Sequence, residues 1–177
     1  MINKHGGGAR TNEFGLKFEQ DTNLKEALRA VGYTVSDGHV QDQDGNLVAI
    51  SAKKHKLYKR LLKPRKINWK DYISKQLLPD EALYVPSANT LFIIEKKFQH
   101  KAGSVDEKLQ TCDFKKKQYQ KLVSKLGWEV EYLYVCNDWF KRAEYKDVHS
   151  YIKSVGCHIF FNAIPLDFLE LPPVAEE

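Results

Sequence analysis

The spacing of apolar residues along the chain predicts alternating helices and strands. Between residues 14 and 31 the apolar positions recur at close to helical spacing, and Gly32 follows as a helix-ending glycine. Short strand-like stretches occupy 33–51, with a hairpin turn at 44–46 (Asp-Gly-Asn). This part of the chain is therefore expected to form one helix followed by a small antiparallel unit.

The second half alternates strand, helix, strand, helix and strand, which is typical of an α/β protein. The strands are short and rich in β-branched and aromatic residues, and glycines follow the helices. No repeat or linker indicates a second domain, so residues 1–177 are expected to form one domain with a loose tail from about residue 172. The expected elements are strands at 80–85 and 90–98 joined by a turn at 86–89, a helix capped by Ser104 or Asp106 and ended by Gly127, a strand at 130–136, a helix at 146–156 and a strand at 158–164.

Positive charge is concentrated in one segment. Ten basic residues and one acid between Lys53 and Lys75 give this segment a charge of +9, whereas the whole chain carries +5, so the remainder is net −4. Apolar and aromatic residues interleave with the charges, which predicts one or two short helices interrupted near Pro64. A solvated helix face is the alternative, but this charge density favours a polyanion partner. The expected DNA contacts are Lys53, Lys54, Lys56, Lys59, Arg60, Lys63, Arg65 and Lys66, with Lys141 and Arg142 from a later polar loop.

Composition argues against several other classes of protein. No window of 18 apolar residues could cross a membrane, and residues 1–10 are glycine-rich and lack the apolar stretch of a secretory signal. The three cysteines have no paired spacing, which favours reduced thiols in the cytoplasm over a disulfide framework or a zinc site. The six histidines show no metal-binding spacing either. The chain is therefore expected to be a cytoplasmic protein without a membrane partner.

The most informative motif is Pro79-Asp80, followed after fourteen residues by Glu95-Lys96-Lys97. Side chains at i and i+2 of a strand share a face, so Glu95 and Lys97 are expected to project together. If 80–85 and 90–98 form a hairpin, Asp80 lies opposite them. Two carboxylates beside an ammonium suit Mg²⁺, which binds proteins through one or two carboxylates and keeps several waters.

These residues resemble the motif of the PD-(D/E)xK nuclease superfamily, and the layout of the chain resembles a small type II restriction endonuclease. The resemblance implies a restriction-endonuclease-like α/β core of order αβββαβ, with a central mixed sheet flanked by helices. It also implies that Asp80 and Glu95 bind Mg²⁺, with Mn²⁺ as a substitute, and that Lys97 is catalytic. Relatives often add a glutamate from the first helix and a polar residue from the helix after the motif. Glu19 and Gln110 are the residues chosen for these roles, with Glu107 and Gln99 as alternatives to Gln110.

The expected function is Mg²⁺-dependent hydrolysis of double-stranded DNA at a specific sequence. A homodimer is expected, because cutting both strands of a palindromic site needs two active sites related by a two-fold axis. Two alternatives remain open at this stage. One is a structure-selective or repair endonuclease of the same fold, such as a junction resolvase, and the other is a non-catalytic DNA-binding protein in which the motif is coincidental.

Overall fold

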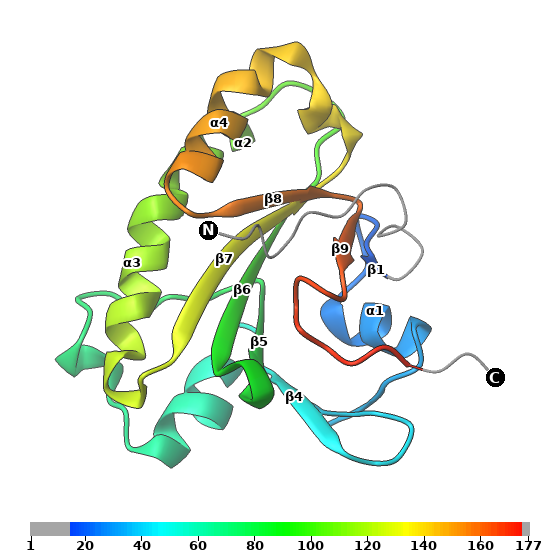
Figure 1. The fold of residues 1–177 in the computed structure, drawn as a ribbon. Helices are drawn as coiled ribbons and strands as arrows, with labels where there is room; N and C mark the ends of the chain where they lie inside the picture. Colours follow the sequence, from blue (N-terminus) through cyan, green and yellow to red (C-terminus); the bar gives the residue numbers. More distant parts are fainter. Residues whose placement is uncertain (1–14, 175–177) are drawn as a thin grey trace.

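The computed structural model describes residues 15–174, which are built around a seven-stranded mixed sheet (Figure 1). The strand order is β2-β3-β4-β5-β6-β7-β8. Neighbours from β2 to β6 are antiparallel, whereas β6, β7 and β8 run parallel. The strands are β2 (Thr34–Ser36), β3 (His39–Gln41), β4 (Leu47–Ser51), β5 (Glu81–Val85), β6 (Thr90–Lys97), β7 (Glu129–Cys136) and β8 (His158–Phe161).

A second, two-stranded sheet joins the two ends of the described chain, with β1 (Gly15–Lys17) antiparallel to β9 (Ala163–Pro165). The α-helices are α1 (Leu24–Ala30), α2 (Val105–Lys108), α3 (Cys112–Leu122) and α4 (Lys146–Ser154). The basic segment forms a wide π-helical turn (Leu57–Leu62) and 3₁₀ turns (Lys63–Arg65 and Trp69–Asp71). Further 3₁₀ turns are Pro86–Ala88, Leu109–Thr111, Ser124–Leu126, Asp138–Lys141 and Ala143–Tyr145.

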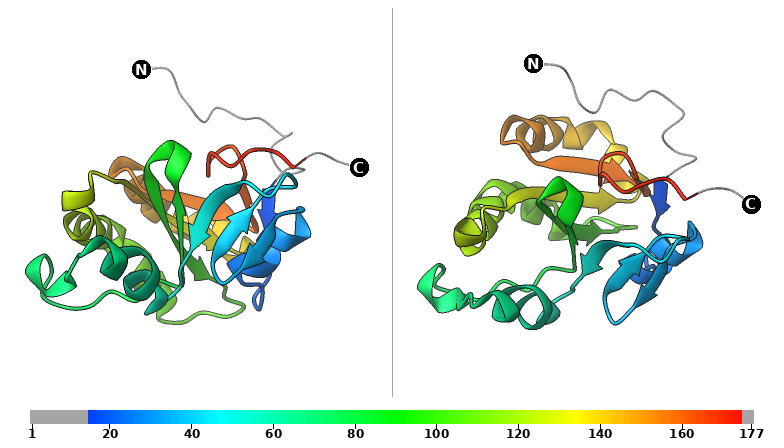
Figure 2. Two further views of the ribbon diagram at one scale, coloured as in Figure 1. Left: turned by 90° about the horizontal axis from the view of Figure 1, so that it is seen from below. Right: turned by 60° about the horizontal axis from the view of Figure 1, so that its bottom comes forward.

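The large sheet separates two apolar cores (Figure 2). One core lies between the sheet and α3, α4 and the helical turns of the basic segment, and the other lies towards α1 and the small sheet. Alternate residues of β6 divide between them, since Ile93 belongs to the first core and Ile94 to the second. The strand alternation therefore sends Glu95 and Lys97 to the side of α3, and Lys96 to the side of α1.

Several predicted elements are confirmed. The hairpin of β5 and β6 closes through the expected turn, and β7 and α4 fall where the pattern predicts them. The 44–46 turn joins β3 to β4, with Gly45 at a φ of 80°. The basic segment is helical in short pieces, as expected, and its π-helical turn ends just before Pro64.

Other predicted elements are wrong. The helix expected at 14–31 is β1 followed by α1, because Asn23 and Glu26 form a reciprocal capping box that starts the helix at Leu24. The long helix after Ser104 is interrupted by a 3₁₀ turn between α2 and α3, and the Ser104 side chain makes no capping hydrogen bond. The last strand divides at Asn162, whose φ is 61°, into β8 and β9.

Three further findings bear on the sequence expectations. No helix among residues 15–174 is long and apolar enough to span a membrane. Cys112, Cys136 and Cys157 are buried and free. The glycine-rich start lies outside the described residues, and at the other end Pro172, where a loose tail was expected to begin, accepts a hydrogen bond from the Tyr33 hydroxyl.

Candidate active site

The β5–β6 hairpin brings the two motif carboxylates into contact. Glu81 pairs with Ile94 in the register, so Asp80 lies next to Glu95 at the open end of the hairpin. The Asp80 N–H donates to Glu95 Oε1 at 3.4 Å, and the Lys96 N–H donates to Asp80 Oδ2 at 3.1 Å. The backbone of the hairpin therefore holds both carboxylates in place.

Burial and mutual repulsion perturb this pair of acids. Glu95 is 7% exposed. Burial first, and then the charge of Asp80 and a hydrogen bond to it, raise the pKa of Glu95 to about 7. Burial also opposes ionisation of Asp80, but hydrogen bonds with Glu95 and Lys54 outweigh it and hold the pKa of Asp80 below its ordinary value. Near neutral pH Glu95 is therefore still partly protonated, whereas Asp80 is ionised.

Two lysines on the α3 side of the sheet lie close to Glu95. Lys97 Nζ is 3.9 Å from Glu95 Oε2, and its side chain is 18% exposed. Lys115 of α3 is also near enough for its charge to oppose the rise in the pKa of Glu95. The motif residues thus converge as their spacing predicted, and α3 adds a cation that the sequence analysis did not identify.

Lys54, which follows β4, also contacts the acid pair through Asp80. Its Nζ is 2.7 Å from Asp80 Oδ1, with the Lys54 side chain 50% exposed. The Lys54 N–H donates to the Pro79 carbonyl at 2.9 Å, which ties the two backbones together. The φ of Lys54 is 50°, a left-handed conformation that costs a non-glycine residue roughly 1–2 kcal/mol. Lys54, expected as a DNA contact, is therefore an ion-pair partner of the site.

The oxygen atoms of Asp80 and Glu95 fit a hard divalent cation. Mg²⁺ needs only one or two protein carboxylates, because waters complete its shell. Asp80 and Glu95 together supply two carboxylates, which is within that number. Among residues 15–174, no group of three or more His, Cys, Asp or Glu side chains could hold a metal.

Glu19 lies on the opposite face of the sheet. It belongs to the connection between β1 and α1 rather than to a helix, and its side chain is exposed. Lys96 Nζ donates to the carbonyls of Glu19, Gln20 and Thr22, which ties this connection to the α1 side of β6. The structure therefore does not bring Glu19 to Asp80 and Glu95.

Of the polar candidates after the motif, Gln110 lies in a 3₁₀ turn with an exposed side chain, and Glu107 is also exposed. Gln99 differs, because it is 7% exposed and both polar atoms of its amide lack a hydrogen-bond partner within residues 15–174. Its backbone is clamped by Asn137, which accepts from the Gln99 N–H at 3.2 Å and donates to the Gln99 carbonyl at 2.6 Å. Gln99 therefore fits a buried polar position after Lys97 better than Gln110 does.

The basic residues upstream divide into two groups. Arg60 donates to the Ser51 carbonyl and pairs with Asp37, and Arg65 lies over the Trp128 ring at 5.0 Å. Like Lys54, which pairs with Asp80, these side chains already contact other groups of the protein, and we call the three the occupied cations. The other predicted contacts from this segment are exposed, and within residues 15–174 no ion pair involves them: Lys53, Lys56, Lys59, Lys63 and Lys66.

The two basic residues of the later loop, Lys141 and Arg142, already have acidic partners. Lys141 pairs with Asp138 at 2.9 Å, and Arg142 pairs with Glu144 at 3.5 Å. Arg142 also lies over the Trp139 ring at 4.2 Å. Both basic side chains remain more than half exposed, so a phosphate could still reach them by displacing weak surface pairs.

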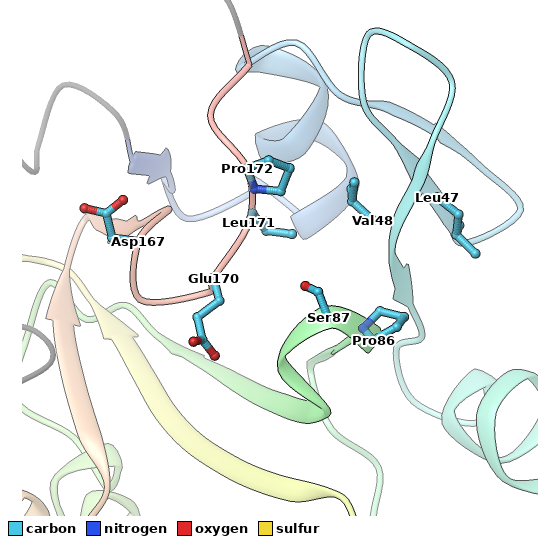
Figure 3. A pocket seen from close by; sticks show the side chains of 8 residues that line it. All are labelled: Leu47, Val48, Pro86, Ser87, Asp167, Glu170, Leu171 and Pro172. Carbon is cyan, nitrogen blue, oxygen red and sulfur yellow. The ribbon is translucent and has the colours of Figure 1, made fainter.

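A shallow groove of about 510 Å³ lies elsewhere on the molecule (Figure 3). It is bounded by Leu47 and Val48 of β4, by the 86–88 turn, and by the segment 167–172. The 86–88 turn closes the β5–β6 hairpin at the end opposite Asp80 and Glu95. The groove therefore forms no part of the candidate active site.

Comparison of the chain with known protein families, with curated protein sequences and with solved structures gives no match.

Proposed function

We propose that the protein is a Mg²⁺-dependent endodeoxyribonuclease that hydrolyses phosphodiester bonds of double-stranded DNA, acting as a type II restriction enzyme. The observation that carries the proposal is the convergence of Asp80, Glu95 and Lys97 at one end of the β5–β6 hairpin. An acid pair beside an ammonium is an arrangement that suits metal-assisted hydrolysis of a phosphodiester.

In this proposal Asp80 and Glu95 hold the metal ion. When bound, Mg²⁺ lowers the pKa of a coordinated water and neutralises charge on the phosphate. Lys97, mostly buried and fixed beside Glu95, orients the attacking water or stabilises the negative charge that develops on the phosphate oxygens. The attacking water releases a proton to solvent as its oxygen bonds to phosphorus, the bond from phosphorus to the leaving oxygen breaks, and the leaving oxygen takes up a proton from solvent.

Two further features support DNA as the substrate. Within the order α1, β2, β3, β4, β5, β6, α2, α3, β7, the elements α1, β4, β5, β6, α3 and β7 are compatible with the αβββαβ arrangement of restriction-endonuclease-like cores, with β2, β3 and α2 as additional elements. The exposed lysines of the basic segment are near Lys54 in sequence, and Lys54 contacts Asp80, which supports a DNA backbone bound by this segment close to the acid pair. Cutting both strands of a symmetric sequence would use a homodimer, with one site for each strand.

The proposal is tested by incubating linear and supercoiled duplex DNA with the protein and Mg²⁺. The wild type should yield discrete fragments, whereas Glu95→Ala and Lys97→Ala should bind DNA without cutting it. Glu129→Ala, which removes an exposed carboxylate at the start of β7, is the matched control and should cut normally. Normal cutting by both site variants would show that the catalytic residues lie elsewhere.

The same assay distinguishes the two alternatives when a branched DNA substrate, further divalent ions and a measurement of DNA binding are added. Cutting confined to branched DNA would identify a structure-selective or repair nuclease of the same fold. Binding without cleavage under any divalent ion would identify a non-catalytic DNA-binding protein. Gel filtration or sedimentation in the presence of DNA tests the homodimer.

A further inference from the structure

We propose that Lys54 is a resident counter-ion, which occupies the Asp80 carboxylate while no divalent cation is bound and leaves it when one binds. The inference rests on the proposed function, because it takes Asp80 and Glu95 as the cation site. It assigns Lys54 a role in metal binding that is distinct from a contact with DNA.

The position of Lys54 is built into the fold. The residue follows β4 in a left-handed conformation that lysine rarely adopts, and its N–H is fixed to the Pro79 carbonyl, next to Asp80. This backbone places the ammonium 2.7 Å from Asp80 Oδ1. No other ion pair among residues 15–174 is as short. A surface lysine without such an anchor would be free to take many rotamers.

The charge balance explains why one cation must move. With both carboxylates ionised, Lys54 and Lys97 already balance the charges of Asp80 and Glu95, and Lys115 adds a further positive charge near Glu95, so a divalent cation gains little attraction from the cluster as it stands. Withdrawal of one ammonium lowers the positive charge by one unit and frees an oxygen ligand.

Of the two lysines, Lys54 is the one that can withdraw. Its side chain is 50% exposed, so its ammonium can leave the carboxylate and be hydrated by solvent at little cost in free energy. Lys97 is only 18% exposed and its Nζ stays 3.9 Å from Glu95 rather than in a close pair. The half-exposed lysine is therefore the displaceable cation, and the buried one stays in the site.

The test measures binding of Mn²⁺ to the metal-free protein by isothermal titration calorimetry at pH 8, without DNA. Lys54→Met keeps the length of the side chain and removes its charge, and it should bind Mn²⁺ roughly three- to tenfold more tightly than the wild type. Lys53→Met makes the same charge change one residue away, without contact to Asp80, and should alter the affinity by less than about twofold. Lys54→Arg retains a cation and should stay close to the wild type. Thermal unfolding of each variant confirms that it is folded.

The outcomes separate this inference from the proposed function. Equal Mn²⁺ affinity in the wild type and in Lys54→Met, with binding lost in Asp80→Asn, would overturn the role of Lys54 and leave the cation site intact. Weaker binding by Lys54→Met would also overturn it, because Lys54 would then organise the ligands rather than compete for them. Absence of Mn²⁺ binding in every form would remove the cation site and the proposed function together.

Discussion

Replacing Glu95 by glutamine should stabilise the metal-free protein at alkaline pH. A buried carboxyl whose pKa is raised in the folded state binds protons more tightly there than in the unfolded chain. The free energy of unfolding is therefore highest when Glu95 is protonated, and it falls as pH rises from the ordinary pKa of 4.5 to about 7. Glutamine has the same shape and stays neutral, so the free energy of unfolding of the Glu95→Gln variant does not fall in this way as pH rises.

The magnitude follows from the size of the pKa change. Each pH unit corresponds to about 1.4 kcal/mol, so a rise from 4.5 to about 7 sets an upper bound of about 3 kcal/mol at pH 8. The attraction between Glu95 and Lys97 across 3.9 Å already lowers this pKa, so it is contained in the bound. Relaxation of the site around an ionised carboxylate recovers part of the penalty, so the expected gain is about 1–2 kcal/mol at pH 8 and close to zero at pH 5.

The assay is urea unfolding in the presence of EDTA at pH 5 and pH 8, followed by tryptophan fluorescence. Glu129→Gln removes an exposed carboxylate from the next strand and should change stability by less than about 0.5 kcal/mol at either pH. Adding Mg²⁺ at pH 8 should stabilise the wild type more than Glu95→Gln. A gain that is absent at pH 8, or equal at both pH values, would refute the assignment of a strained acid pair at this site.

Three smaller predictions concern the surrounding fold. Arg65→Ala removes the guanidinium lying over Trp128 and Tyr84 and should destabilise the protein by about 1–2 kcal/mol in the same urea assay. Lys59→Ala should leave stability within about 0.5 kcal/mol of the wild type, yet weaken duplex binding and reduce its logarithmic salt slope by about one, measured by fluorescence anisotropy. Asn23→Ala breaks the capping box of α1 and should cost about 1 kcal/mol, which thermal or urea unfolding can measure.

The convergence of the motif could be predicted because it depends on local rules. The apolar run at 91–94 fixes β6, and the alternation of side chains then places Glu95 and Lys97 on one face. The short turn at 86–89 sets the register, and that register brings Asp80 next to Glu95.

The start of the chain was misread for a physical reason that the sequence also contains. Leu16 of β1 and Phe18, the residue after the strand, are buried on either side of the exposed Lys17, but so short an alternation cannot be distinguished from one turn of an amphipathic helix. The pair Asn23 and Glu26, spaced as a capping box, is the readable signal that the helix begins at Leu24. Given that signal, Glu19 would have been placed before the helix.

Lys54 could not be placed from the sequence, because its contact depends on a left-handed backbone at a residue that rarely adopts one. Lys115 was missed for a different reason. Its approach to Glu95 depends on how α3 packs on the sheet, which periodicity does not determine. Gln99 lies beyond the end of β6, so strand alternation alone could not establish its burial.

The division of the basic segment changes how its charge should be understood. The sequence presents ten cations as one polyanion-binding surface, but Lys54, Arg60 and Arg65 are occupied by Asp80, by Ser51 and Asp37, and by the ring of Trp128. The occupied cations fix the segment to the sheet, and the exposed lysines around them are held in a defined position as a result. Among the occupied cations, Lys54 is the one that pairs with the acid pair. One ion pair therefore links the surface expected to hold a DNA backbone to the carboxylates expected to cut it.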